Sequence, residues 1–111
     1  MHDSLLTARS VRNTITYVEK NIYNFPNEYK VLKERILNSC YDILENVYRA
    51  NLDQDINSKK EALVQLKMLN YYLKQALDKE LITKKKFLSY GNHLTEIHNM
   101  LRSWCGYEKS E

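Results

Sequence analysis

The side chains that could support catalysis or bind a metal are few in this sequence, and their spacing favours neither. His93 and His98 are five residues apart, which places them about 140° apart around a helix, so they do not share a metal as an i, i+4 pair does. Asp53 and Asp55 share a polar segment that lacks the glycine and the remaining ligands of a calcium loop. We therefore predict that the protein is not an enzyme and uses no metal or cofactor.

The lysines are spaced more regularly than these histidines and aspartates. Lys60, Lys67 and Lys74 recur every seven residues, so on a helix they form one stripe. Lysine is a point charge that suits contacts to phosphate without base readout, although such a stripe is also typical of a solvated helix face. The formal net charge of +3 permits a polyanionic partner without demanding one. The candidate nucleic-acid contacts are Lys60, Lys67, Lys74, Lys84 and Lys85, followed by Arg12 and Lys20.

The elements that position these side chains are predicted to be helices. The chain has only two glycines and one proline among 111 residues, which favours long helices joined by short loops. Apolar residues recur at alternating steps of three and four, and this spacing predicts helices over residues 4–25, 27–51, 57–81 and 83–105. Short links between helices of similar length favour antiparallel neighbours. We predict a single all-α domain over residues 1–111, an antiparallel up-down-up-down four-helix bundle.

Several residues mark the expected helix ends. Pro26 disfavours a helical conformation in the residue before it and therefore closes the first helix. Asp55, Asn57 or Ser58 is expected to cap the start of the third helix, and Thr83 the start of the fourth. A polar tail is expected after the fourth helix.

The second and third helices carry more apolar residues than a bundle core needs. About three residues in seven point inward in such a helix, yet tyrosines and aliphatic residues also occupy the outer sides of these two helices. Burial of apolar surface is favourable by about 25 cal/mol per Å², and large apolar patches are uncommon on monomers. We therefore expect a homo-oligomer; the alternative is partial shielding by the N-terminal segment and lysine stems. The predicted interface residues are Tyr41, Tyr48, Val64, Met68, Tyr71 and Tyr72.

The cysteines and the N-terminus favour a reduced compartment. Cys40 and Cys105 lie within apolar helical patterns and form no CxxC pair, so we expect buried free thiols. The N-terminus lacks the basic segment and long apolar run of a signal peptide. No stretch approaches the roughly 20 apolar residues of a membrane span. We therefore expect a cytoplasmic protein with no membrane partner and no small-molecule substrate.

Three segments, in this order, resemble those of a known family. The first is NFPNEYKVLKERILNSCYDILENVYRAN, which contains Phe25-Pro26 and Glu34-Arg35-Ile36. The second is LVQLKMLNYYLKQALDKELIT, a leucine-rich helix before a Leu-Ile-Thr turn. The third is LTEIHNMLRSWC, a closing signature that ends at Trp104. Together they resemble the Avd-like proteins, the accessory variability determinants of diversity-generating retroelements, which are grouped with four-helix-bundle proteins encoded in ribosomal-RNA intervening sequences.

The resemblance implies a barrel-like homopentamer of four-helix bundles with a basic surface and no catalytic residues. It also implies binding to a reverse transcriptase and to template RNA or cDNA. The first hypothesis is therefore a non-enzymatic accessory protein of a diversity-generating retroelement. The second is a helical protein–protein scaffold encoded in a ribosomal-RNA intervening sequence, with no nucleic-acid role.

Overall fold

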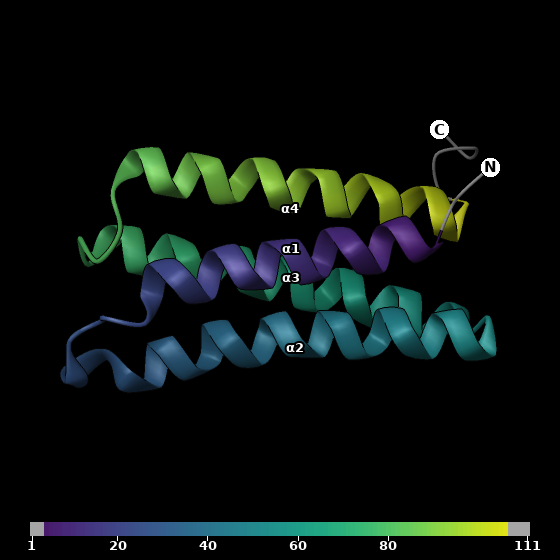
Figure 1. The fold of residues 1–111 in the computed structure, drawn as a ribbon, viewed down its shortest axis with the longest axis horizontal. Coiled ribbons are helices and arrows are strands. Elements are labelled where there is room, and N and C mark those ends of the chain that lie inside the picture. The colour runs from purple at the N-terminus through teal and green to yellow at the C-terminus, as the bar shows by residue number, and fades with distance from the viewer. Residues whose placement is uncertain (1–3, 107–111) are drawn as a thin grey trace.

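Four long helices make up the described part of the chain. The computed structural model describes residues 4–106, in which the helices are α1 (Ser4–Ile22), α2 (Lys30–Asp53), α3 (Ile56–Asp78) and α4 (Lys84–Cys105). The longest dimension is 42 Å, little more than one such helix at roughly 1.5 Å per residue. The helices therefore lie side by side along the molecule (Figure 1). The predicted all-α class and the four-helix bundle are confirmed.

The backbone of each helix runs close to those of the two helices beside it and farther from that of the helix diagonally opposite. Contacts join α1 to α2, α2 to α3, α3 to α4 and α1 to α4, and the α2–α3 pair is the most extensive. In Figure 1, α4 lies along the top, α2 along the bottom, and α1 passes in front of α3. Within residues 4–106, the Cα atoms of α1 and α3 stay more than 8 Å apart. The α1–α2 edge and the α3–α4 edge are therefore on opposite sides of the bundle.

The core is built from one apolar row on each helix, as the spacing predicts. Ile36 on α2, Leu73 on α3 and Leu101 on α4 are fully buried. Burying a side chain of this kind contributes about 1.5–3 kcal/mol. Three large aromatic residues are only half-buried and pack against the core, namely Phe25, Phe87 and Trp104.

α1 ends three residues before the predicted boundary. Its last residue is Ile22 rather than Phe25, because Pro26 disfavours a helical Phe25 and its ring clashes with the carbonyl group four residues earlier. The Phe25 N–H instead donates to the Ile22 carbonyl oxygen at 3.1 Å. A 3-10 turn over Asn27–Tyr29 follows, so α2 begins at Lys30 rather than at residue 27.

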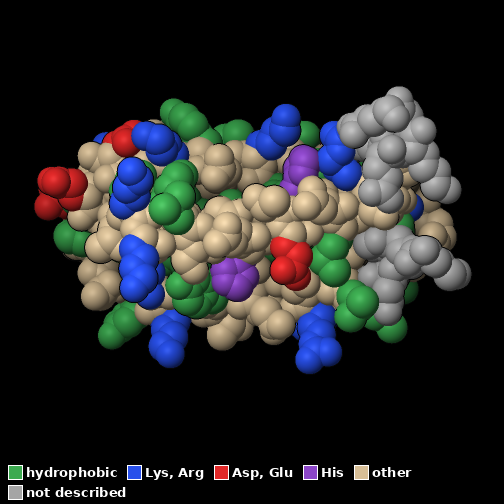
Figure 2. Space-filling view, turned by 90° about the horizontal axis from the view of Figure 1, so that it is seen from above, with side chains coloured by type: hydrophobic (Ala, Val, Ile, Leu, Met, Phe, Trp, Pro, Cys, Tyr) green, Lys and Arg blue, Asp and Glu red, His purple; other side chains and the backbone are tan. Residues whose placement is uncertain are grey.

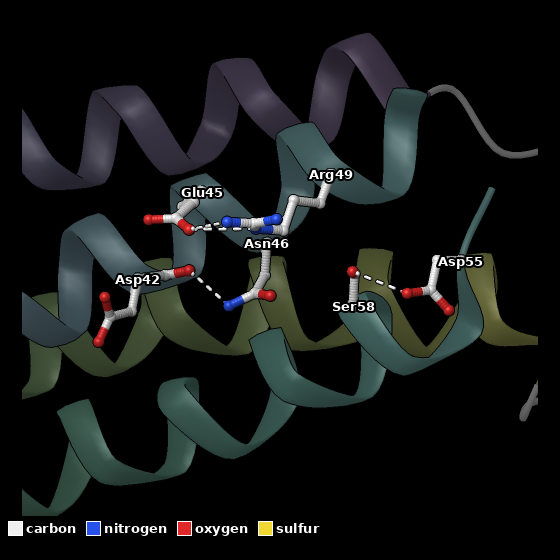
Figure 3. A network of polar contacts seen from close by, with 6 residues as sticks. All are labelled: Asp42, Glu45, Asn46, Arg49, Asp55 and Ser58. Carbon is white, nitrogen blue, oxygen red and sulfur yellow. Dashed lines mark hydrogen bonds and ion pairs between the residues drawn. The ribbon is translucent and has the colours of Figure 1, made fainter. Parts of the chain in front are cut away.

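The link between α2 and α3 is short and capped on both sides. Gln54 has a left-handed backbone with φ of 55°, and its N–H donates to the Ala50 carbonyl oxygen at 2.9 Å. Of the three predicted caps, Asp55 fills the role. Its carboxylate accepts from the Asn57 N–H at 2.9 Å. It also accepts from the Ser58 hydroxyl at 3.2 Å (Figure 3). α2 and α3 therefore form a tight antiparallel hairpin.

α3 also ends three residues before its predicted boundary, in a Schellman turn. The Leu81 N–H donates to the Ala76 carbonyl oxygen and the Glu80 N–H to the Leu77 carbonyl oxygen, both at 2.9 Å. Glu80 adopts φ of 60°, the left-handed conformation that this turn requires. The turn satisfies the last carbonyl groups of α3 and directs Leu81 back against the core.

Both ends of α4 are capped. Thr83 is the start cap, as predicted, because its hydroxyl accepts from the Lys86 N–H at 3.1 Å. Gly106 follows the helix with φ of 81°, a conformation that glycine adopts at little cost. The predicted polar tail and the extreme N-terminus lie outside the described residues. None of the helices in residues 4–106 carries the long, weakly charged apolar stretch of a membrane span.

The turn after α3 predicts that Glu80→Gly stabilises the protein. Glu80 is exposed, and a side chain in the left-handed region costs about 1–2 kcal/mol, part of which the greater freedom of glycine in the unfolded chain offsets. We expect a gain of about 0.5–1 kcal/mol in the free energy of unfolding, measured by urea denaturation followed by circular dichroism. Lys79→Gly, at φ of −89°, is the matched control and should be destabilising. Equal losses in both variants would contradict the turn geometry.

Candidate nucleic-acid interface

The lysine stripe runs along the edge of α3 that faces α4. Lys60, Lys67 and Lys74 are all exposed, and Lys67 lines the groove between the two helices. Successive lysines are about 10.5 Å apart along the helix axis. Lys74 Nζ lies 2.8 Å from Asp78 Oδ1, an exposed pair that is stabilising by only a few tenths of a kcal/mol. The stripe is therefore aligned and open to solvent.

A groove between α3 and α4 lies beside this stripe. Its volume is about 340 Å³, at the lower end of the range of roughly 300–1,000 Å³ for ligand pockets. Leu66 and Leu94 are buried and form its floor, whereas Asn70 and Thr95 stand exposed at its walls. The full lining is Leu66, Lys67, Asn70, Gly91, Leu94, Thr95 and His98.

Positive charge also gathers where α4 begins. Lys84 and Lys85 are exposed, and Lys84 lines a second hollow with Leu77, one turn beyond the last lysine of the stripe. The Lys86 ammonium lies 5.4 Å from the centre of the Tyr17 ring. The first turn of α4 carries no acidic residue, although the helix dipole favours acids there. Lysines in this place lower stability but raise the local positive potential, a conflict typical of functional sites.

The face of the molecule that includes α4 is mainly basic. Seen over α4, lysine and arginine side chains gather at one end and along both edges, with fewer acidic side chains between them (Figure 2). The structure therefore brings four of the predicted contacts to the α3–α4 edge, namely Lys60, Lys67, Lys74 and Lys84, with Lys85 next to them at the start of α4.

The two remaining predicted contacts lie elsewhere. Arg12 and Lys20 are exposed residues of α1, the helix diagonal to α3. The Arg12 guanidinium donates to the Tyr48 hydroxyl of α2 at 3.1 Å. Arg12 therefore lies on the α1–α2 edge, on the opposite side of the bundle from the lysine stripe.

Lys59 has a structural role that sequence reasoning missed. It is only 9% exposed, and its Nζ lies 4.8 Å from the centre of the Trp104 ring and 3.4 Å from the Trp104 carbonyl oxygen. It joins the start of α3 to the last turn of α4, where the helix dipole favours a cation. Its place on the inner flank of α3, one residue before the stripe, is the signal that could have identified it.

The predicted interface residues fall into two patches, of which the first lies on α2 near α1. The Tyr41 hydroxyl donates to the Glu19 carboxylate, and this hydrogen bond raises the pKa of Tyr41. Leu52 is 84% exposed and shares a shallow hollow with both tyrosines of this helix. We call this surface the α2 patch; it consists of Tyr41, Leu44, Tyr48 and Leu52.

The second patch lies on the outer side of α3, next to the lysine stripe. Val64 and Tyr71 are 51% and 56% exposed. Met68 is half-buried, and Tyr72 packs partly against the core with its ring 5.9 Å from that of Tyr71. We call this surface the α3 patch; it consists of Val64, Met68, Tyr71 and Tyr72.

Polar side chains of α2 separate the two patches. Arg49 and Glu45 form an ion pair at 2.6 Å, and the Asn46 amide donates to the Asp42 carbonyl oxygen at 2.9 Å (Figure 3). At about 100° per residue, these positions lie nearer to α3 than the tyrosines of the α2 patch do. The six predicted interface residues therefore do not form one continuous face.

Burial raises rather than lowers the pKa of both cysteines, Cys40 and Cys105. His98 lines the α3–α4 groove, whereas the His93 ring lies 5.1 Å from that of Tyr17 on α1, on the other side of α4. Across residues 4–106, no three histidine, cysteine or acidic side chains gather as a metal site requires. Burial raises the pKa of Cys40 to about 12 and that of Tyr90 to about 12. Both stay protonated at neutral pH, and a reactive cysteine needs the reverse.

The two free thiols should react at different rates. Cys40 is 1% exposed, whereas Cys105 is half-buried; burial raises the pKa of Cys105 too, although nearby cations oppose the rise. We expect a disulfide reagent at pH 8 to modify Cys105 in the folded protein and Cys40 only after unfolding. The measurement is thiol release with and without denaturant, and Cys105→Ser should abolish the native-state reaction. Rapid modification of Cys40 in that variant would contradict the buried position.

Comparisons with known proteins relate the chain to one family and one fold. The family described as bAvd-like matches residues 5–108. Among solved structures, a protein of unknown function from the S23 ribosomal protein family of Bacteroides thetaiotaomicron is similar, with a TM-score of 0.84 and 25% sequence identity. That match covers 93% of this chain and 97% of the other. Among curated proteins, none matches significantly.

Proposed function

Because the chain belongs to the bAvd-like family, we propose that it is a non-enzymatic accessory protein of a diversity-generating retroelement. In this proposal it works in the cytoplasm and binds the reverse transcriptase together with template RNA or cDNA, through a basic surface of a homo-oligomeric barrel. The observation that carries the nucleic-acid role is the exposed lysine stripe beside the α3–α4 groove.

The stripe suits phosphate contacts that do not depend on sequence. Each lysine that neutralises a phosphate releases a counterion, so binding weakens steeply as salt rises. One subunit has a net charge of only +3. A ring would repeat the stripe around its circumference, and fields of that kind concentrate polyanions. Assembly is therefore part of the proposed mechanism.

The two separate apolar patches support a closed ring. A twofold dimer uses the same self-complementary surface on both subunits, whereas a head-to-tail ring joins two different surfaces of neighbouring subunits. The α2 patch and the α3 patch lie on different helices, and the exposed ion pair of Glu45 and Arg49 lines the hollow of the α2 patch. We propose that the α2 patch of one subunit contacts the α3 patch of the next, in a homopentamer.

The alternative is a helical scaffold encoded in a ribosomal-RNA intervening sequence, without a nucleic-acid role. The apolar patches suit that function equally well. It gives no reason, however, for three lysines at the start of α4 with no acid in the first turn. The bAvd-like match also favours the retroelement role.

Reversing the charge of the stripe should abolish nucleic-acid binding. We expect the double variant Lys67→Glu, Lys74→Glu to bind a labelled RNA more than about tenfold more weakly, because two phosphate contacts per subunit become repulsive. Filter binding in rising salt measures the affinity, and circular dichroism checks that the helices persist.

The matched control for this experiment is Lys30→Glu, Arg35→Glu. Both residues are exposed on α2, and the change in net charge is the same. This control should lose much less affinity than the stripe variant. Equal losses would show that net charge alone governs binding, and an unaffected stripe variant would refute the assignment of the stripe.

Ring closure through the two patches can be tested by mixing variants. Tyr48→Asp, Leu52→Asp disables the α2 patch, and Val64→Asp, Tyr71→Asp disables the α3 patch. Light scattering should find each variant alone as a monomer of 13.3 kDa. An equimolar mixture should form heterodimers and nothing larger, because only one intact pair of patches remains.

Val31→Asp, Leu88→Asp serves as the control, since both residues are exposed apolar side chains outside the two patches. This control should keep the wild-type size. Wild-type protein that stays monomeric at high micromolar concentration would rule out the ring, as would homodimers of either patch variant.

A further inference from the structure

Gly91 lies in the middle of α4, where its residue type is unfavourable. Apart from proline, glycine is the residue least suited to a helix interior. Beyond its chain neighbours and the nearby backbone of its own helix, a Cβ atom at this position would meet no atom within 4 Å, so no close contact with another helix requires glycine. The missing side chain instead leaves space in the α3–α4 groove, which Gly91 lines. The fold of one subunit therefore does not explain this glycine, but an occupant of the groove does.

The groove around this glycine presents hydrogen-bonding groups without partners. Asn70 of α3 faces it, together with Thr95 and His98 of α4. In the part of the chain that is described, none of these three side chains makes a hydrogen bond. The buried side chains of Leu66 and Leu94 supply an apolar floor. An amide, a hydroxyl and an imidazole around an apolar floor match a nucleobase, which has apolar faces and polar edges.

The charge around the groove selects an anionic occupant. Lys67 lines the groove itself, and Lys60 and Lys74 lie two turns to either side of it on the same helix. Among the acidic residues within 4–106, only Asp78 forms an ion pair with a lysine of the stripe, Lys74. The backbone of a peptide carries no charge that could pair with these lysines, whereas the backbone of a nucleic acid carries one at each phosphate.

We propose that the α3–α4 groove takes one unpaired nucleotide of single-stranded RNA or DNA, while the flanking phosphates lie along the lysine stripe. This inference rests on the proposed function and specifies which form of nucleic acid the site holds. A duplex keeps its bases stacked inside and offers the groove only its backbone, whereas a single strand can turn a base outward. Gly91 leaves the space that the nucleotide fills.

The test introduces a side chain into the groove at the position of Gly91. Gly91→Ala and Gly91→Leu in the full chain are compared by fluorescence anisotropy with a labelled oligouridylate and with a blunt RNA duplex of equal length. We expect Gly91→Ala to raise the melting temperature by about 4 °C and yet to weaken single-strand binding by about fivefold or more. Gly91→Leu should weaken it further, and duplex binding should change less than about twofold.

Asn92→Ala is the matched control. Asn92 is the next residue, exposed, and lines a hollow with His93 and Glu96 on the other side of α4. The change also favours the helix, so it should raise the melting temperature while leaving both affinities unchanged. A gain in stability combined with a loss of binding is therefore specific to the groove.

The outcomes separate this inference from the proposed function. Unchanged single-strand affinity in both Gly91 variants overturns the inference, while the loss of binding in the Lys67 and Lys74 variant still supports the proposed function. A change in oligomer size in the Gly91 variants shows that the groove is a contact between subunits, which also overturns it. Wild-type protein that binds neither RNA at low salt refutes the proposed function itself.

Discussion

The structure depends on the packing of four apolar helix faces against one another in the core of a single subunit. Ile22, Ile36, Leu73 and Leu101 are fully buried, and each row comes from one helix, so every helix needs the others to remove its row from water. Most of the stability of such helices comes from this burial rather than from intrinsic helix propensity. Because the core closes without help from the outer faces, lysines, tyrosines and even a mid-helix glycine can occupy those faces without loss of the fold.

The same closure fixes which surfaces are neighbours. α1 lies diagonally opposite α3, so side chains on the α1–α2 edge cannot join those on the α3–α4 edge within one subunit. This separates Arg12 from the lysine stripe, whereas polar side chains of α2 lie between the α2 patch and the α3 patch. The stripe, by contrast, borders the α3 patch on one helix. In the proposed ring, contact through that patch places the lysines close to each boundary between subunits, which links assembly to the strength of the positive field.

The lysine stripe and the α3–α4 groove differ in how their binding would tolerate a change of geometry. Contacts between lysine and phosphate act over distance and weaken with salt, so their exact geometry matters less than their alignment. The groove is different, because its floor and walls come from two helices held by the core. In the proposed complex, the groove holds one nucleotide in place, while the lysine stripe holds the flanking phosphates loosely.

The sequence by itself determined the helices, their core rows and most of their caps, because these depend on spacing and on local backbone chemistry. It misplaced three helix boundaries by three residues each. Pro26 ends α1 early, a 3-10 turn delays the start of α2, and a Schellman turn at Glu80 ends α3 early. It also identified the lysine stripe, since seven-residue spacing on one helix is a local property. Only the tertiary structure decided that Arg12 lies apart, that Lys59 is buried and that Gly91, Asn70 and His98 meet in one groove. Those relations join residues far apart in the chain, and the way the helices pack together, rather than any local pattern, sets which of them become neighbours.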